Sequence, residues 1–192
     1  MKITIIEGAR GVGKSTIVKE VRNALINTVS INFTGHRGDD EESKEAILNH
    51  FTNFVTCLNY EDFDKSPFNY LFDRFFFSEM VYSRLYKSYD FSNHYAKLMR
   101  ELDRLGKRVE IRVLHLRVDE DTMKNNLKRE GKASLFGDDK LSDTVHSSMT
   151  QDNEYAKIFS ESKKEFLNIN FIEVNLSGKT LEEAIDLVKY HC

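Results

Sequence analysis

Three glycines followed by a lysine and a hydroxyl side chain give the clearest chemical signal in this sequence. Residues 8 to 15 read Gly-Ala-Arg-Gly-Val-Gly-Lys-Ser, which is the pattern G-x-x-x-x-G-K-[ST]. Such glycines allow backbone N–H groups to turn inward around a phosphate group. Lys14 supplies a mobile cation for the outer phosphates, and the Ser15 hydroxyl group can bind Mg²⁺. The pattern predicts a nucleotide-binding loop, formed by Gly8, Ala9, Arg10, Gly11, Val12, Gly13, Lys14, Ser15 and Thr16.

A second pair of reactive side chains, Asp73 and Arg74, follows the short apolar run Asn69–Phe72. An arginine at the end of a strand can grip a phosphate group with two parallel hydrogen bonds. A carboxylate there can approach the Mg²⁺ of the glycine loop or orient an acceptor oxygen. The alternative is a structural salt bridge that ties the end of the strand to a helix. Together with the glycine loop, the pair favours a functional role.

The elements around the glycine loop are those that must position it. Residues 2–7 are short and rich in β-branched side chains, which predicts a buried parallel strand. Residues 16–25 place apolar side chains at helical spacing. A strand, a glycine loop and a helix in this order are the context that the motif requires, and the start of the helix adds the positive end of its dipole.

Candidate strands alternate with candidate helices along the rest of the chain. The predicted strands are Lys2–Glu7, Thr28–Phe33, Asn69–Asp73, Val109–Leu116 and Phe171–Val174. The predicted helices are Thr16–Leu25, Glu41–Leu58, Ser78–Tyr86, Ser92–Leu105, a helix capped by Asp119 and ending at Gly131, Thr144–Phe166, and one opening at Thr180. Gly106 is expected at the left-handed position after its helix. The alternation predicts a single α/β domain over residues 1–192, with a parallel sheet between layers of helices.

Composition excludes several classes of protein. The net charge of −3 is not that of a protein that wraps extended nucleic acid. No stretch reaches the roughly 18 apolar residues of a membrane span. Because a strand is predicted from Lys2 onward, we expect no signal peptide. The only cysteines, Cys57 and Cys192, fit a reducing compartment, so we expect a cytoplasmic protein without a disulfide.

The glycine loop and the Asp73-Arg74 pair together resemble the motifs of a known family. The glycine loop, followed by a strand that ends in Asp73-Arg74, an aromatic residue, Ser78 and later Tyr82, is similar to the thymidylate kinases and the related deoxynucleoside kinases. Phe75 stands where the thymidylate kinases have tyrosine. The resemblance implies a P-loop fold with a five-stranded parallel sheet, a mobile lid, ATP with Mg²⁺ as the donor, and often a homodimer. Lys14, Asp73 and Arg74 would then be catalytic, with Ser15 and Asp73 near the metal.

The resemblance also implies where a lid would lie. It corresponds to the segment around Lys124–Lys132, in which Arg129 would be the cation that neutralises the transferred phosphoryl group. The alternative is a helix end that is basic because its dipole favours positive charge there. The polar loop that follows, residues of about 131–142, has no helical periodicity and is expected to be the mobile lid.

On the acceptor side, Arg37 could contact an acceptor phosphate. The helix Glu41–Leu58 corresponds to one that presents an aromatic side chain to the base, so Phe51 or Phe54 could stack on it beside Phe75. Core packing is the alternative for at least one of these side chains. The arginine expected in this helix is missing, which leaves thymine specificity open.

The two possible acceptors require different chemistry. A nucleoside hydroxyl group needs a carboxylate to take its proton, for which Asp39, Asp40 and Asp73 are candidates. The alternative for Asp39 and Asp40, which the sequence favours, is the acidic start of the helix that follows. A monophosphate is already ionised and needs cations, which Arg37 and Arg74 would supply. Charge matching favours a nucleoside monophosphate. A GTPase or ATPase switch, suggested by Asp103–Gly106, and a kinase of nucleic-acid 5′ ends are more remote alternatives.

Overall fold

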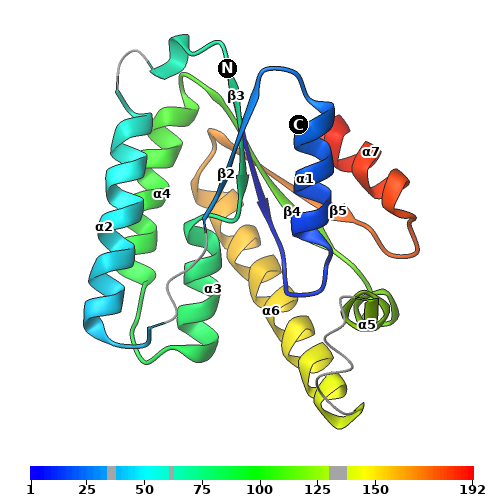
Figure 1. Ribbon diagram of the computed structural model, residues 1–192. Helices are drawn as coiled ribbons and strands as arrows, with labels where there is room; N and C mark the ends of the chain where they lie inside the picture. Colours follow the sequence, from blue (N-terminus) through cyan, green and yellow to red (C-terminus); the bar gives the residue numbers. More distant parts are fainter. Residues whose placement is uncertain (34–37, 61–62, 130–137) are drawn as a thin grey trace.

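The computed structural model describes residues 1–33, 38–60, 63–129 and 138–192 (Figure 1). Within this part of the chain, strands and helices alternate as the sequence predicts. The strands are β1 (Lys2–Glu7), β2 (Thr28–Asn32), β3 (Asn69–Asp73), β4 (Glu110–Arg117) and β5 (Ile169–Asn175). The helices are α1 (Lys14–Ala24), α2 (Glu41–Leu58), the 3₁₀ turn η1 (Phe63–Lys65), α3 (Phe76–Tyr86), α4 (Ser92–Gly106), α5 (Glu120–Arg129), α6 (Asp138–Glu165) and α7 (Leu181–His191).

The described strands form one parallel sheet in the order β2-β3-β1-β4-β5. β1 lies at the centre, and its side chains from Ile3 to Glu7 are all buried, which explains its continuous β-branched character. Ile6 of β1 pairs with Asp73 of β3. The carboxyl ends of these two strands therefore lie side by side, and the loops that follow them meet at one edge of the sheet.

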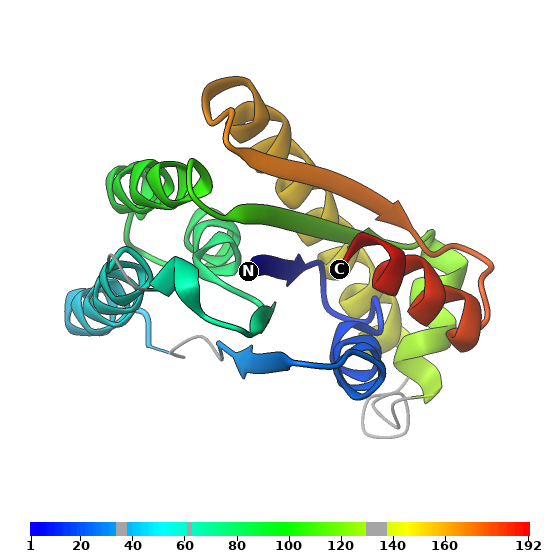
Figure 2. The ribbon, with the colours of Figure 1, turned by 90° about the horizontal axis from the view of Figure 1, so that it is seen from above.

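Helices cover both faces of the sheet, as Figures 1 and 2 show. α1 and α7 lie on one face, and α2, α3, α4 and α6 lie on the other. Each face has its own apolar cluster, one built around Phe72 and Phe76 and the other around Ile6 and Val21. The predicted three-layer α/β architecture with a five-stranded parallel sheet is confirmed.

The capping residues predicted at the starts of α5 and α7 are confirmed. Asp119 accepts a hydrogen bond from the backbone N–H of Thr122 at 2.8 Å and caps α5. Thr180 and Glu183 form the predicted capping box at the start of α7.

The start of α6 differs from the prediction. The sequence predicts a polar loop up to Ser142, but α6 already begins at Asp138. Leu141 and Val145, one helical turn apart, are both buried in an apolar cluster that includes side chains of α5. This tertiary packing stabilises a helical turn that local composition does not reveal. The loop prediction was therefore wrong for residues 138–142, and residues 131–137 of the predicted lid lie outside the described residues.

Gly106 also differs from its predicted role. It is the last residue of α4, and it is not among the described glycines with positive φ. A Cβ atom at this position would lie 2.3 Å from the backbone oxygen of Asn168. Asn168 is held there by hydrogen bonds from its backbone and side-chain nitrogens to Asp103, both at 2.9 Å. Close approach of two backbones, rather than a left-handed turn, explains this glycine.

Replacing Gly106 by alanine should therefore destabilise the protein by roughly 1–3 kcal/mol, as overpacking does. In an unobstructed helix the same change stabilises by about 0.8–1 kcal/mol, because glycine is the poorer helix former. Urea unfolding of the two proteins measures the difference. An alanine variant that is more stable than the wild type would contradict the close contact.

Candidate nucleotide-binding and phosphoryl-transfer site

The glycine loop joins the end of β1 to the start of α1. Gly8, Gly11 and Gly13 all have positive φ, and Gly13, at +87°, is the residue from which α1 begins. Only glycine adopts such angles without strain. The helix therefore starts with its backbone N–H groups at the loop, next to exposed Ser15 and Thr16, which is the arrangement of an anion site.

Helix α5 braces this loop from the side. A Cβ atom on Gly11 would lie 2.7 Å from the sulfur atom of Met123 and 2.9 Å from a side-chain carbon of Leu127. The Asn126 side-chain amide donates a hydrogen bond to the backbone oxygen of Gly11 at 3.0 Å. Gly11, which occupies a variable position of the motif, is thus required by the packing of α5 as well as by its own φ.

Lys14 and Asp73 form an ion pair at the edge of the sheet. The Nζ atom of Lys14 lies 3.2 Å from Oδ1 of Asp73, and the two side chains are 4% and 6% exposed. Asn32, at the end of β2, donates to Oδ2 of Asp73 at 2.7 Å. Burial, together with the positive charge of Arg74, lowers the pKa of Lys14, and Asp73 opposes this shift. The expected mobile cation is therefore a buried, paired lysine in this conformation.

Arg74 lies in the turn between β3 and α3 with φ of +70°. Its backbone N–H donates to the backbone oxygen of Ile6 at 3.0 Å, and its guanidinium group donates to Oγ of Ser78 at 3.3 Å. Positive φ is uncommon for residues other than glycine, and such strained positions cluster at functional sites. The backbone of this turn directs the arginine to the edge of the sheet where the glycine loop also lies.

Glu7, the last residue of β1, is a member of the site that the sequence interpretation missed. Its side chain is 0% exposed, and its carboxylate accepts hydrogen bonds from the Phe75 N–H and the Ser78 hydroxyl group, both at 2.6 Å. Burial raises the pKa of the Glu7 carboxyl group to about 6, against the opposing effects of Ser78, Arg74 and Lys14. An acidic residue directly after the β-branched run Ile3–Ile6 was the signal that could have identified it.

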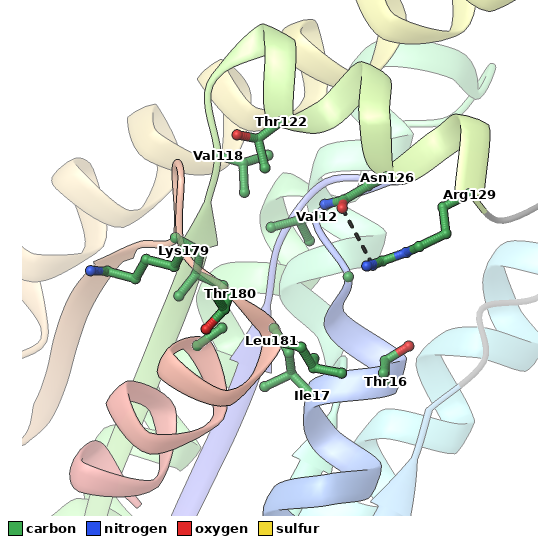
Figure 3. Close-up of a pocket in the computed structure, with 13 residues that line it drawn as sticks. Val12, Thr16, Ile17, Val118, Thr122, Asn126, Arg129, Lys179, Thr180 and Leu181 are labelled. Carbon is green, nitrogen blue, oxygen red and sulfur yellow. Dashed lines mark hydrogen bonds between the residues drawn. The ribbon is translucent and has the colours of Figure 1, made fainter.

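A pocket of about 60 Å³ lies beside the loop, on the side of α5 and α7 (Figure 3). Figure 3 shows Arg129 reaching from α5 toward Asn126, with which it forms a hydrogen bond of 3.4 Å. The other wall is the turn from β5 into α7, which the sequence interpretation did not assign to the site. The residues that line the pocket are Val12, Gly13, Thr16, Ile17, Val118, Thr122, Asn126, Arg129, Leu176, Lys179, Thr180, Leu181 and Ala184.

The aromatic residues predicted to contact a base are packed together. Phe51 and Phe75 are 5% and 1% exposed, and their ring centroids lie 5.5 Å apart. Phe33 packs against both of them and against half-buried Phe54, whose ring centroid lies 4.8 Å away. Core packing accounts for Phe51 and Phe75 in this conformation, and stacking on a base stays a prediction for all three.

The predicted site residues thus separate into groups. Lys14, Asp73 and Arg74 meet at one edge of the sheet, whereas Arg129 lies at the pocket on the other side of the glycine loop. Arg10 has an exposed side chain, and its backbone N–H donates to the Gln151 side chain of α6 at 3.2 Å. Arg37 lies outside the described residues.

The acidic residues after β2 have structural roles. Asp40 caps α2 by accepting a hydrogen bond from the Ser43 N–H at 2.8 Å. Asp39 accepts a hydrogen bond from the Ser88 N–H through its carboxylate, and its backbone oxygen accepts one from the Ser88 hydroxyl group at 2.6 Å. These contacts tie the start of α2 to the connection between α3 and α4.

The fold of this chain recurs in solved structures. The YorR protein from Bacillus subtilis, in complex with phosphorylated GDP, matches with a TM-score of 0.66 at 16% identity, over 99% of this chain and 95% of that chain. Thymidylate kinase from Candida albicans matches with a TM-score of 0.59 at 16% identity, over 99% and 90%. Deoxyadenosine kinase from M. mycoides, with bound dATP, matches with a TM-score of 0.55 at 18% identity, over 100% and 98%.

The chain has the fold of the P-loop kinases. The predicted resemblance is confirmed at the level of the fold. No protein-family model and no curated protein matches this sequence. Across the described residues, no helix is both long and apolar enough to span a membrane.

The donor set at the loop of this P-loop kinase fold suits a magnesium ion held mainly by a nucleotide. Ser15 offers an exposed hydroxyl group, and Asp73 offers a carboxylate beside the loop lysine. In the part of the chain that the structure describes, no group of three or more His, Cys, Asp or Glu side chains could hold a metal by itself. Mg²⁺ fits such a site, because it commonly binds through one or two protein oxygens, phosphates and water.

Proposed function

We propose that this protein is an ATP-dependent phosphotransferase that phosphorylates a nucleoside or deoxynucleoside monophosphate. The observation that carries the proposal is the juxtaposition of Lys14, Asp73 and Arg74. Lys14 belongs to the glycine loop, and Arg74 follows the neighbouring strand, with Asp73 between them. Two cations at the same edge of the sheet suit a reaction in which a phosphate group moves from a donor to an acceptor.

On the donor side, the backbone N–H groups at the start of α1 would hold the β- and γ-phosphates together with Lys14. The pocket of Figure 3 would receive the base, because it lies at the adjoining end of the glycine loop. None of its described lining residues carries a carboxylate to accept the ring and amino hydrogens of guanine. This lining favours ATP over GTP.

Arg129 borders the same pocket from α5, close to the exposed start of α1. A small rotation of its side chain away from Asn126 would bring its charge toward the outer phosphates. Bound Mg²⁺ would neutralise charge between the β- and γ-phosphates, with Ser15 and Asp73 as the residues that would hold it.

On the acceptor side, the candidate general bases support a monophosphate rather than a nucleoside. Asp73 is paired with Lys14 and Asn32, Asp40 caps α2, and Asp39 binds Ser88. A carboxylate committed in this way is a poor base for an unactivated hydroxyl group. Arg74, by contrast, offers a guanidinium group that can hold a phosphate dianion with two hydrogen bonds.

These residues would position the donor and the acceptor and neutralise the charge of the transferred phosphoryl group. Phosphoryl transfer requires the acceptor oxygen, the γ-phosphorus atom and the leaving oxygen to lie nearly in line. Lys14 would hold the donor and Arg74 the acceptor, while Asp73 would fix the position of Lys14. Two of the compared proteins are a thymidylate kinase and a deoxyadenosine kinase, which supports a small-molecule acceptor. A cytoplasmic location and a homodimeric state stay predictions from the sequence.

A screen of acceptors tests the proposal. The purified protein is incubated with ATP, Mg²⁺ and each common nucleoside or monophosphate in turn, and ADP and the phosphorylated product are measured. We expect turnover with one or more monophosphates and little with nucleosides, because only the former matches the charge of Arg74. The Lys14→Met variant, prepared in the same way, controls for contaminating kinases. Turnover with nucleosides alone would overturn the monophosphate assignment and make Asp39, Asp40 or Asp73 the general base.

A further inference from the structure

Glu7, Ser78 and Tyr155 form a closed polar network inside the protein, which we call the Glu7 cluster. Glu7 ends β1, Ser78 lies in the first turn of α3, and Tyr155 lies in the middle of α6. Glu7 and Tyr155 are both 0% exposed, and Ser78 is 8% exposed. The cluster joins a central strand to two helices on the same face of the sheet.

The Glu7 carboxylate is the acceptor of hydrogen bonds from both hydroxyl groups of the cluster. Oε2 of Glu7 accepts from the Ser78 hydroxyl group at 2.6 Å and from the Tyr155 hydroxyl group at 3.3 Å. The oxygens of Ser78 and Tyr155 lie 2.7 Å apart. Because Ser78 donates to Glu7, its oxygen is left to accept, and Arg74 donates to it at 3.3 Å. The carboxylate therefore fixes the orientation of the Ser78 hydroxyl group, so that its oxygen lone pairs are available to Arg74.

Glu7 also acts on the backbone of Arg74. Its Oε1 atom accepts the N–H of Phe75, the residue directly after Arg74, at 2.6 Å. The N–H of Arg74 itself is held by Ile6, the residue directly before Glu7. The strained turn at Arg74 is thus clamped on both sides by the last two residues of β1.

Packing alone does not explain why a carboxylate, rather than a neutral side chain, is buried at position 7. Taking a carboxylate out of water is costly, and a neutral side chain of similar size would join β1 to α3 at less expense. Arg74 and Lys14 are the cations that stabilise the charged form of Glu7. A carboxylate linked to the phosphate-binding arginine through a hydroxyl group resembles the outer shells that orient binding groups in other sites.

We propose that Glu7 is a positioning residue for the acceptor phosphate, acting on Arg74 through Ser78 and the Phe75 amide. This inference rests on the proposed function, since Arg74 is the group that would bind the acceptor. Both oxygens of Glu7 accept hydrogen bonds, so glutamine at this position would have to turn its NH₂ group toward a donor. One of the two hydrogen bonds by which Glu7 holds Phe75 and Ser78 next to Arg74 would then be lost.

The test compares Glu7→Gln and Ser78→Ala with the wild type in steady-state kinetics. Both variants should raise the KM for the monophosphate acceptor by roughly tenfold or more, whereas the KM for ATP should change less than about twofold. The matched control is Tyr95→Phe, which removes another buried hydroxyl contact, to Ser162 at 2.8 Å, away from Arg74. This control should lower thermal stability without changing either KM.

A double variant distinguishes positioning from a general structural role. If Glu7 acts through Arg74, then Glu7→Gln should add little to the acceptor KM when Arg74 is already alanine. An effect of Glu7→Gln that is equal in both backgrounds, or that raises the two KM values alike, would overturn the inference. A wild type without monophosphate turnover would overturn the proposed function, and this inference with it. An active wild type with an unaffected Glu7→Gln variant would overturn this inference alone.

Discussion

Replacing Lys14 by methionine should lower kcat/KM for phosphoryl transfer by a factor on the order of a hundred or more, the cost of losing one preorganised charge at the transition state. Methionine keeps most of the volume of the buried side chain and removes only its charge. The loss should appear mainly in kcat, because the charge of the transferred group is greatest at the transition state. Steady-state kinetics with ATP and the best monophosphate from the screen measure the effect.

The burial of Lys14 makes a stability control necessary. Removing one partner of a buried ion pair typically costs roughly 3–5 kcal/mol, because the remaining charge is left without compensation. Asp73 would be that charge, although Asn32 still donates to it. The double variant Lys14→Met, Asp73→Asn should regain stability in urea unfolding and remain inactive. A Lys14→Met variant with near-normal turnover would show that the glycine loop is not the donor site.

The sequence predicted the parts of the fold that depend on short-range patterns. β1 is a continuous run of buried β-branched residues, and the glycine loop and α1 follow it without interruption. The starts of α5 and α7 follow from capping residues within four positions of each other. The alternation of strands and helices then leaves few topologies for a parallel sheet.

Features that depend on contacts between distant residues could not be predicted in this way. The clamp on Arg74 needs the pairing of Ile6 with Asp73, which joins residues far apart in the chain. The first turn of α6 is stabilised by burial of Leu141 in a cluster that also contains Met123 and Leu127. No local pattern records either contact.

The state of Lys14 was misjudged for a related reason. The motif alone suggests a mobile cation, since its lysine must reach the outer phosphates of a nucleotide. The structure instead pairs it with Asp73, which the register of β1 and β3 brings to the end of the loop. In this conformation, a bound nucleotide would have to compete with Asp73 for the lysine. The aromatic residue Phe75 was likewise interpreted as a base contact from its place in the motif, although its ring packs inward.

Replacing Arg74 by lysine should be nearly as harmful as replacing it by alanine. Lysine preserves the charge but not the planar fork that can hold a phosphate group and the Ser78 hydroxyl group at once. Its ammonium group is also more strongly hydrated, which increases the cost of replacing the half-buried guanidinium group of Arg74. We expect both variants to raise the acceptor KM by roughly ten- to a hundredfold, with a much smaller change in the KM for ATP.

A matched lysine substitution at an arginine of α3, the helix that follows Arg74, makes this prediction specific. Arg84 of α3 forms surface ion pairs with Glu154 at 2.7 Å and Glu161 at 3.8 Å. Exposed pairs of this kind contribute about 0–1 kcal/mol, so Arg84→Lys should leave both KM values close to those of the wild type. Lysine at position 74 with near wild-type efficiency would reduce Arg74 to a structural salt bridge, the alternative that its motif leaves open. If both Arg74 variants lose acceptor binding and Arg84→Lys does not, acceptor binding depends on the guanidinium group of Arg74 and not only on its charge.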